Sequence, residues 1–197
     1  MKLLLASRSE ARRRMLTSAG VRFETVAAEL DEEEAKAGLL GAGFEPRDLA
    51  EMLAEMKARS VDAAGDALVL GADQVLELDD GSVLGKPGSR GEALRQLRSL
   101  SGRIHYLHSA AVVVENGERA WGDTETAGLR VRRLSEAFLR DYLDREFEAV
   151  RGNVGGYRIE GFGVQMFDEI QGSHFAILGL PLLPLLGYLR GRGMVAS

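Results

Sequence analysis

An apolar run that ends in an acid constrains the fold of this chain more than any other stretch. Residues 67–73 read ALVLGAD, which has the length and composition of a buried strand. Acids are scarce at the carboxyl ends of such strands, and open α/β sheets bind their ligands there. We therefore predict that Asp73 lies at a ligand-binding edge of a sheet. The alternative, an aspartate that only caps a turn, stays open.

Strand and helix patterns alternate along the rest of the chain. Aspartate-glycine at 80–81 and asparagine-glycine at 116–117 predict tight hairpin turns. The predicted strands are 2–6, 21–28 and 67–73, with hairpins over 75–85 and 104–134, and the predicted helices are 9–20, 46–65, 89–102, 135–146 and 181–190. This mixture predicts an α/β fold with a mixed sheet. The length fits a single domain over 1–197, or two lobes that share one core.

Composition limits the kind of protein. Cysteine is absent, which excludes disulfides, thiolate zinc sites and cysteine nucleophiles. Three histidines are too few for a histidine-rich metal cage, so a metal would be held by oxygen ligands. A net charge of −5 argues against broad binding to nucleic acid. The first apolar run precedes its arginines, the reverse of a signal peptide, so we expect a cytoplasmic protein with no membrane partner.

The stretch SRSEARR, residues 7–13, stands where the first strand meets the first helix. The amide groups at a helix N-terminus are unpaired, and the helix dipole favours an anion there. Ser7, Ser9 and Arg12 could therefore surround a phosphate. Taken alone, the stretch favours a plainer interpretation, a capping serine followed by solvated arginines.

Three further residues could serve a phosphorylated ligand. Glu32, in the acidic run 30–34, could supply a carboxylate to magnesium, although such a run is more often a solvated loop. Lys57 lies on a predicted helix and has little individual weight. Lys86 precedes a proline that fixes the local chain, on a strand beside that of Asp73, and a plain hairpin-end lysine is the alternative.

The segment 155–163, GGYRIEGFG, has glycines on both sides of Glu160. Such a loop lets the backbone approach a flat base or a phosphate, although one glycine-rich loop is a weak signal. For His105, His108, His174 and Trp121 we expect packing roles in the sheet, in turns or in the hairpin.

Taken together and in order, these stretches resemble the Maf family of nucleoside triphosphate pyrophosphatases. The matching pieces are LASRSEARRRML, ELDEE, AEMKA, GADQV, GKP, LSG, GGYRIEGFG and GLPL. The resemblance implies an inosine-triphosphatase-like fold, an elongated mixed sheet with two lobes around a cleft, and often a homodimer. It also implies hydrolysis of a nucleoside triphosphate to the monophosphate and pyrophosphate, with a divalent cation, Mg²⁺ or Mn²⁺.

The resemblance also implies a role for each candidate residue. Ser7, Ser9 and Arg12 would hold phosphates, Glu32 and Asp73 would serve the metal and the water, and Lys57 and Lys86 would neutralise the triphosphate. Asp73 would accept the proton of the attacking water, and Lys86 would counter the charge of the transition state. Phosphoryl chemistry of this kind depends mostly on positioning and charge stabilisation.

Base preference follows from another set of positions. The thymidine and uridine triphosphate branch usually has arginine, threonine and glutamine where this chain has Ala11, Gln74 and Glu160. Gln74 and Glu160 instead resemble the branch that hydrolyses 7-methylguanosine triphosphate, because a carboxylate can accept both N–H donors of a guanine edge. That branch usually has tryptophan at position 11, and in the family lysine is often found where this chain has Asn153. A dTTP/UTP pyrophosphatase and a non-catalytic regulator of septum formation are the alternatives.

Overall fold

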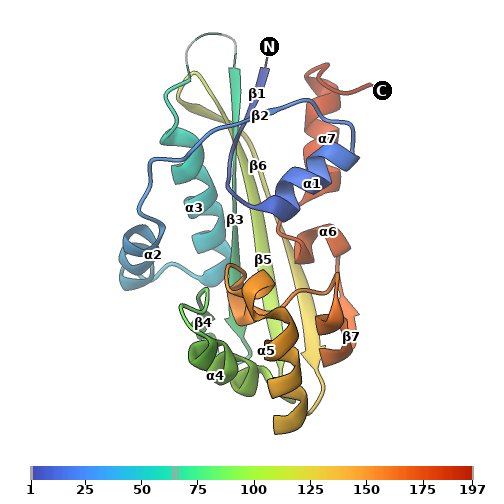
Figure 1. Cartoon of the computed structure of the whole chain (residues 1–197). Coiled ribbons are helices and arrows are strands. Elements are labelled where there is room, and N and C mark those ends of the chain that lie inside the picture. Colours follow the sequence, from blue (N-terminus) through green and yellow to red (C-terminus); the bar gives the residue numbers. More distant parts are fainter. Residues whose placement is uncertain (1, 64, 66, 197) are drawn as a thin grey trace. The chain divides into compact units, whose positions relative to one another are not determined.

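The computed structural model describes residues 2–63, 65 and 67–196 (Figure 1). The strands in these residues are β1 (Lys2–Ala6), β2 (Glu24–Thr25), β3 (Ala67–Leu78), β4 (Val83–Leu84), β5 (Ile104–Glu115), β6 (Glu118–Val131) and β7 (Phe167–Gln171). The α-helices are α1 (Glu10–Ser18), α2 (Glu32–Gly41), α3 (Pro46–Arg59), α4 (Arg90–Leu100), α5 (Glu136–Val150), α6 (His174–Ile177) and α7 (Leu182–Gly191). Two short 3-10 turns span Val154–Gly156 and Phe162–Met166.

The strands of the described residues form one mixed sheet in the order β2-β1-β3-β5-β6-β7, with β4 paired to β3. β1 runs parallel to β2 and β3, whereas β4 runs antiparallel to β3 and β7 runs antiparallel to β6. Asn116 and Gly117 both have positive φ, 51° and 80°, as a two-residue hairpin turn requires. The predicted α/β class with a mixed sheet is confirmed, and so is the long hairpin.

The chain divides into two compact units, and β3, β5 and β6 each pass from one to the other. Unit 1 contains the described residues of Met1–Gln74, His108–Thr126 and Ser173–Ser197, and unit 2 contains Val75–Leu107 and Ala127–Gly172. The single domain over 1–197, with a cleft between its lobes, stays a prediction.

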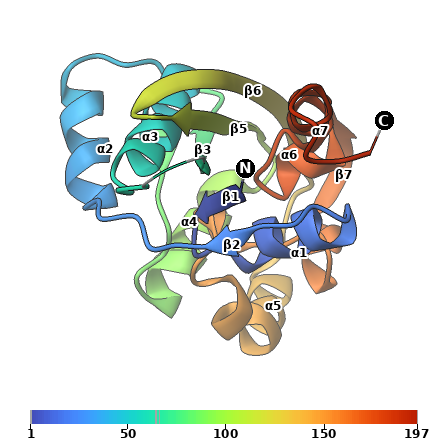
Figure 2. The ribbon, with the colours of Figure 1, turned by 90° about the horizontal axis from the view of Figure 1, so that it is seen from above.

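Unit 1 carries helices on both faces of β1 and β3. α1 and α7 lie on one side of these strands, and α3 lies on the other (Figure 2). Successive residues of a strand point to opposite faces, so Leu68, Leu70 and Ala72 join the cluster beside α1 and α7, while Gly71 faces α3. A Cβ on Gly71 would overlap the carbonyl oxygen of Ala54, so α3 packs directly on the backbone of β3.

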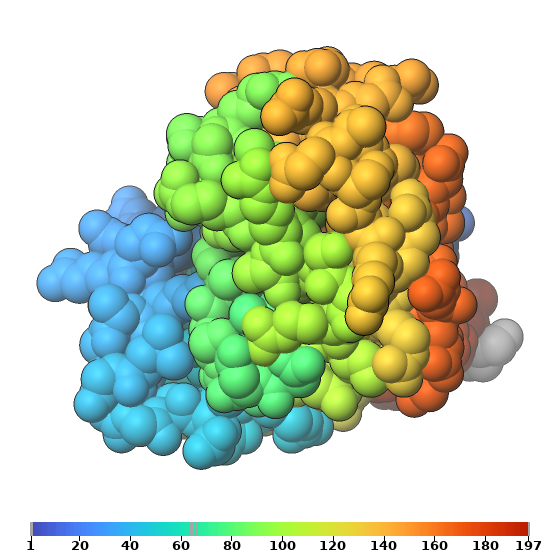
Figure 3. Space-filling view, turned by 90° about the horizontal axis from the view of Figure 1, so that it is seen from below, coloured from blue at the N-terminus to red at the C-terminus, as the bar shows by residue number. Residues whose placement is uncertain are grey.

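Unit 2 places α4 in contact with α5, where residues 90–100 appear in green and residues 136–150 in orange (Figure 3). Tyr142 of α5 is fully buried, with its ring stacked on those of Phe138 and Phe162. His105 is also fully buried, and its Nε2 lies 2.6 Å from the hydroxyl of Tyr157. The packing role predicted for His105 is confirmed.

The other three residues predicted to pack also have contacts within unit 1. His108 is buried, with its Nδ1 2.9 Å from the hydroxyl of Thr126. Trp121 stacks on Tyr188 at a centroid distance of 5.4 Å. His174 is exposed at the start of α6, where its ring meets its neighbour in the chain edge-on. Packing therefore accounts for His108 and Trp121, whereas the packing role predicted for His174 is wrong, because its side chain is exposed.

Several element boundaries differ from those predicted. The strand 21–28 shrinks to Glu24–Thr25, and the helix predicted over 46–65 ends at Arg59, with Ala64 outside the described residues. The acidic run predicted as a loop begins helix α2. Strand β7 and helix α6 were not predicted, because each is short and follows a glycine-rich stretch. Among the described residues, each helix is too short or too polar to cross a membrane.

Candidate active site

Asp73 lies within β3 and not at its end, because the strand continues to Leu78. The predicted strand end is therefore wrong, and the reason is that Val75 and Leu76 are fully buried and carry the strand onward. The side chain of Asp73 follows the alternation of the strand and faces α3, like Gly71. Its Oδ1 accepts a hydrogen bond of 2.5 Å from the Nζ of Lys57. The turn-capping alternative does not hold for this residue.

Lys57 lies on the buried stripe of α3, four residues after Leu53. Its side chain is only 6% exposed, and its Nζ lies 2.5 Å from Asp73 Oδ1 and 3.2 Å from Glu32 Oε2. Buried charges are found where opposite charges pair with them. One ammonium group thus joins two carboxylates that are far apart in sequence.

Glu32 reaches this group because the acidic run forms a helix. Asp31 is the N-cap of α2, and its side chain accepts hydrogen bonds from the amides of Glu33 and Glu34. Three glutamates in the first turn complement the positive end of the helix dipole. The predicted loop is therefore wrong for a definite reason: the composition that favours solvation also starts a helix when an aspartate caps it. The structure brings Glu32, Lys57 and Asp73 together, and the roles that the family resemblance implies for them remain predictions.

The two carboxylates fit a hard divalent cation. Magnesium is commonly held by one or two carboxylates together with substrate phosphates and water, without a dedicated protein cage. Glu32 and Asp73 provide such a pair, already gathered about one positive charge. In the described part of the chain, no three or more histidine, cysteine, aspartate or glutamate side chains are grouped so that they could hold a metal ion by themselves. The donor set therefore suits a metal that arrives with a phosphorylated ligand.

Ser7, Ser9 and Arg12 meet at the junction of β1 and α1. Ser9 caps α1 by accepting from the amide of Arg12 at 3.4 Å, and the Oγ of Ser7 accepts from the amide of Ser9 at 3.3 Å. The guanidinium of Arg12 donates from Nη1 to Ser7 Oγ at 3.2 Å and to the carbonyl of Ala72 at 2.9 Å, and from Nε to the carbonyl of Gly179 at 2.7 Å. The capping serine is thus present, but Arg12 is not a solvated arginine.

The charge of Arg12 belongs to the same group as the carboxylates. Burial lowers the pKa of Arg12 from its usual value, while the negative charges of Asp73 and Glu32 act in the opposite direction and raise it. An arginine keeps its proton at neutral pH. Two buried cations, Arg12 and Lys57, therefore accompany two carboxylates in unit 1.

Gln74 points to the other face of β3 from Asp73. Its Nε2 donates to Ser109 Oγ at 2.9 Å and to the carbonyl oxygens of Ala176 and Ile177, both at 3.0 Å. The donor end of this amide is therefore engaged by the protein itself, and its Oε1 is the atom that remains for a ligand.

Lys86 and Glu160 both belong to unit 2. Lys86 is exposed two residues beyond the end of β4, between that strand and the buried Pro87, so its predicted place on a strand is wrong. Pairing between β3 and β4 stops at Leu84, because the chain must turn toward α4. Glu160 is exposed on a turn that precedes the second 3-10 turn. The share of these two residues in the site remains a prediction.

Two residues near Asp73 were missed by the sequence reasoning. Ser109 is fully buried in β5 and donates to the carbonyl of Ala176 at 2.6 Å. Gly179 accepts from Arg12 and has a φ of +98°. A hydroxyl inside the apolar run of β5 was the available signal for Ser109. Gly179 lies in the GLPL motif, which carried no assigned role.

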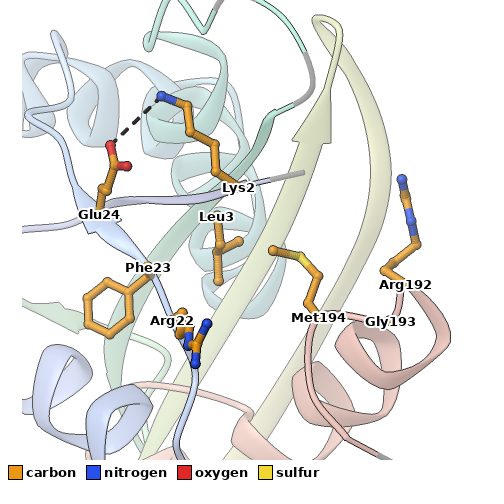
Figure 4. A pocket seen from close by; sticks show the side chains of 8 residues that line it. All are labelled: Lys2, Leu3, Arg22, Phe23, Glu24, Arg192, Gly193 and Met194. Atoms are coloured by element: carbon orange, nitrogen blue, oxygen red, sulfur yellow. Dashed lines mark ion pairs between the residues drawn. The ribbon is translucent and has the colours of Figure 1, made fainter.

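A separate hollow of about 500 Å³ lies beside the start of β1 in unit 1 (Figure 4). An ion pair of 3.8 Å between Lys2 and Glu24 closes part of its rim. The lining residues are Lys2, Leu3, Arg22, Phe23, Glu24, Arg192, Gly193 and Met194. None of the predicted site residues contributes to it.

The chain is similar to several known proteins. The family model described as Maf-like protein matches residues 2–192. A nucleoside triphosphate pyrophosphatase of Sphingopyxis alaskensis is 46% identical over 98% of both chains, and one of Caulobacter vibrioides is 49% identical over 96% of this chain and 94% of its own. A 7-methyl-GTP pyrophosphatase of Rhizobium meliloti is 45% identical over 98% of this chain and 97% of its own. A solved dITP/XTP pyrophosphatase from Mycobacterium abscessus has 20% identity and a TM-score of 0.46, with 98% and 96% of the two chains covered.

Proposed function

Because this chain belongs to the Maf-like protein family, we propose that it hydrolyses a nucleoside triphosphate to the monophosphate and pyrophosphate with the help of a divalent cation. Close relatives that cover the whole chain carry that activity in their names. The single observation that carries the proposal is the group in which the buried Lys57 joins the partly buried carboxylates of Glu32 and Asp73. Such a group can take a metal and a polyphosphate together.

Asp73 accepts the proton of the attacking water. Its Oδ1 is held by Lys57, and among the described residues no hydrogen bond to its Oδ2 is found, so this second oxygen can receive the water. General base catalysis of this kind contributes about 10²- to 10⁴-fold to a rate. Lys57 and Lys86 counter the negative charge of the triphosphate, which grows on the transferring oxygens.

Ser7, Ser9 and Arg12 bind the phosphates. The Oγ of Ser7 already accepts two hydrogen bonds, from the amide of Ser9 and from Arg12 Nη1, so its own proton can be donated to a phosphate oxygen. Arg12 has Nε and Nη1 engaged by the protein and can offer Nη2. Ser9 contributes chiefly the free amides of the helix that it caps.

Glu32 and Asp73 hold the divalent cation, Mg²⁺ or Mn²⁺. When bound, the cation neutralises phosphate oxygens and favours the loss of pyrophosphate as a leaving group. Lys57, whose ammonium contacts both carboxylates, would then be available to donate to the phosphates. The positive charge of Lys57 would then balance negative charge on the substrate.

For the base we propose a guanine-like nucleotide of the 7-methyl-GTP kind, read by Glu160 with the Oε1 of Gln74. The relative from Rhizobium meliloti supports this choice by its name. Asn153, where the family often has lysine, holds the turn before Glu160 through a bond of 3.1 Å from its Nδ2 to the carbonyl of Tyr157. Ala11 leaves room where the branch usually places a tryptophan.

From the resemblance we further propose a cytoplasmic homodimer with a part in nucleotide-pool cleaning or septum formation.

Pyrophosphate release by the purified protein tests the activity, with Mg²⁺ or Mn²⁺ and UTP, dTTP, CTP, GTP and 7-methyl-GTP as substrates. We expect the monophosphate as the second product, a preference for 7-methyl-GTP, and a loss of at least about 10³-fold in kcat for Asp73→Asn. Asp168→Asn, the same change at an exposed position of β7, is the matched control and should keep wild-type turnover. Preference for UTP and dTTP would overturn the base assignment alone. No turnover of any nucleotide would overturn the enzyme and favour a nucleotide-binding regulator.

A further inference from the structure

The backbone around Asp73 is fastened from both sides. β1 pairs with β3 as far as Gly71, and at the next residue the carbonyl of Ala72 accepts from the guanidinium of Arg12. One residue after Asp73, the side-chain Nε2 of Gln74 donates to Ser109 and to the carbonyls of Ala176 and Ile177. Asp73 is thus the residue between two anchored neighbours, on the stretch of β3 where its pairing with β1 has ended.

Arg12 and Gln74 both donate hydrogen bonds to the same short segment, Ser173–Gly179, which contains α6. A helix leaves its last carbonyl groups without partners inside the helix. In this segment, the carbonyls of Ala176 and Ile177 accept from Gln74. The carbonyl of Ala176 also accepts from Ser109, and that of Gly179 accepts from Arg12. Side chains of α1, β3 and β5 therefore satisfy the end of α6.

Two features restrict which residues can occupy positions 179 and 109. Gly179 has a φ of +98°, and a Cβ there would lie 3.3 Å from Arg12 Nη2 and 3.4 Å from its Nε. Ser109 is fully buried, accepts from Gln74 and donates to Ala176. Its hydroxyl is thus used in both directions, which fixes the orientation of the Gln74 amide.

We propose that the segment Ser173–Gly179 positions Asp73 for reaction, with Ser109 and Gly179 as positioning residues. The proposal rests on the proposed function for its kinetic consequence, since Asp73 is the base there. A displacement of about 1 Å in a reacting group can cost about 10²-fold in rate, so a device that fixes the backbone of the base has a large effect on kcat. Ser109 bonds to Gln74 and to Ala176 and not to the residues proposed to bind the phosphates, so its removal should leave phosphate binding almost unchanged.

Ser109→Ala tests the proposal, and Ser99→Ala is its matched control. Ser99 also donates from a serine hydroxyl to a backbone carbonyl, at 2.7 Å, but lies on α4 in unit 2. We expect Ser109→Ala to lower kcat about tenfold with KM changed less than about twofold, and Ser99→Ala to leave both unchanged. Hydrogen exchange of the amides of 72–75 should become faster in Ser109→Ala while the global free energy of unfolding falls only slightly.

The remaining variants separate positioning from other roles. Gly179→Ala crowds Arg12, so it should speed exchange at 72–75 and lower kcat but also raise KM. If Ser109→Ala does not fold, the exchange at 72–75 in Gly179→Ala replaces it as the test. Gln74→Leu should lower kcat for all nucleotides to the same extent if Gln74 positions, whereas a change in base preference alone would assign it to base reading. Unchanged kcat and exchange in folded Ser109→Ala would overturn the proposal. If the wild-type protein hydrolyses no nucleotide, the proposed function fails, and the exchange measurement alone then decides whether the segment holds β3.

Discussion

The Asp73 group of unit 1 (Glu32, Lys57 and Asp73) is centred on a buried lysine, and the His105 pair of unit 2 (His105 and Tyr157) is also buried, yet the two handle charge in opposite ways. Lys57 stays next to two carboxylates, and Arg12 stands close enough for Asp73 and Glu32 to influence its pKa. His105 has no charged partner among the residues that the structure describes. Burial lowers its pKa to about 4, and burial also raises the pKa of its neighbour Tyr157. Burial alone thus favours neutral groups, and opposite charges are needed to keep ions inside.

The difference has a functional meaning. A neutral histidine that shares a proton with a tyrosine can only pack and hold a hydrogen bond, as His105 does with Tyr157. Ions that are held together by one another can exchange partners when a charged ligand arrives. A binding site for a metal and a polyphosphate is therefore expected at the group of Asp73 and not at that of His105.

Lys57→Met removes the cation of the Asp73 group and has the largest expected effect. It leaves Glu32 and Asp73 close together without their shared ammonium, which should lower the free energy of unfolding by about 3–5 kcal/mol in metal-free buffer. Mn²⁺ should restore much of that loss and bind more tightly than to the wild type, since Lys57 no longer competes for the carboxylates. Urea unfolding and calorimetric titration with Mn²⁺ measure both. Equal Mn²⁺ affinity in the two proteins would show that Lys57 and the metal do not share ligands.

Acid should destabilise the folded protein through His105. The pKa of His105 is lowered to about 4 in the folded protein from an ordinary value near 6.5, so the unfolded chain binds the proton first as the pH falls. Stability is therefore complete above about pH 6.5, declines as the pH falls toward 4 and levels off below it, with about 3 kcal/mol at stake. His105→Gln should flatten this part of the profile, and His174→Gln, at an exposed histidine, should not. A wild-type profile that is flat between pH 6.5 and 4 would contradict the assignment.

Sequence patterns predicted best where the local signal and the packing agree. The Asn116-Gly117 hairpin, the cap at Ser89 and the stop at Gly102 follow directly from backbone preferences, and all are present. The joining of Glu32, Lys57 and Asp73 was predicted only through the family resemblance. No local pattern states that a lysine on one helix reaches a strand sixteen residues on and the start of another helix.

The features that were predicted wrongly or not at all depend on contacts between distant segments. The strand did not end at Asp73, because buried residues beyond it prolong the pairing of β3. Ser109 and Gly179 escaped notice because their partners, Ala176 and Arg12, lie far from them in sequence. The single-turn α6 has little propensity of its own and is held by side chains of other elements, which a linear pattern does not show.

Glu146→Gln is the mildest test, because it asks whether paired ions also persist in unit 2. Glu146 is nearly buried on α5, and its Oε2 accepts from Arg158 Nε at 2.6 Å. Arg158 itself is 41% exposed, so water screens the pair and its loss should cost only about 1 kcal/mol. Chemical unfolding at low and high salt measures this, with Glu148→Gln, in an exposed pair on the same helix, as the control. A loss of several kcal/mol would mean that unit 2 depends on buried ions as unit 1 does, and the contrast between the two regions would then lie in His105 alone.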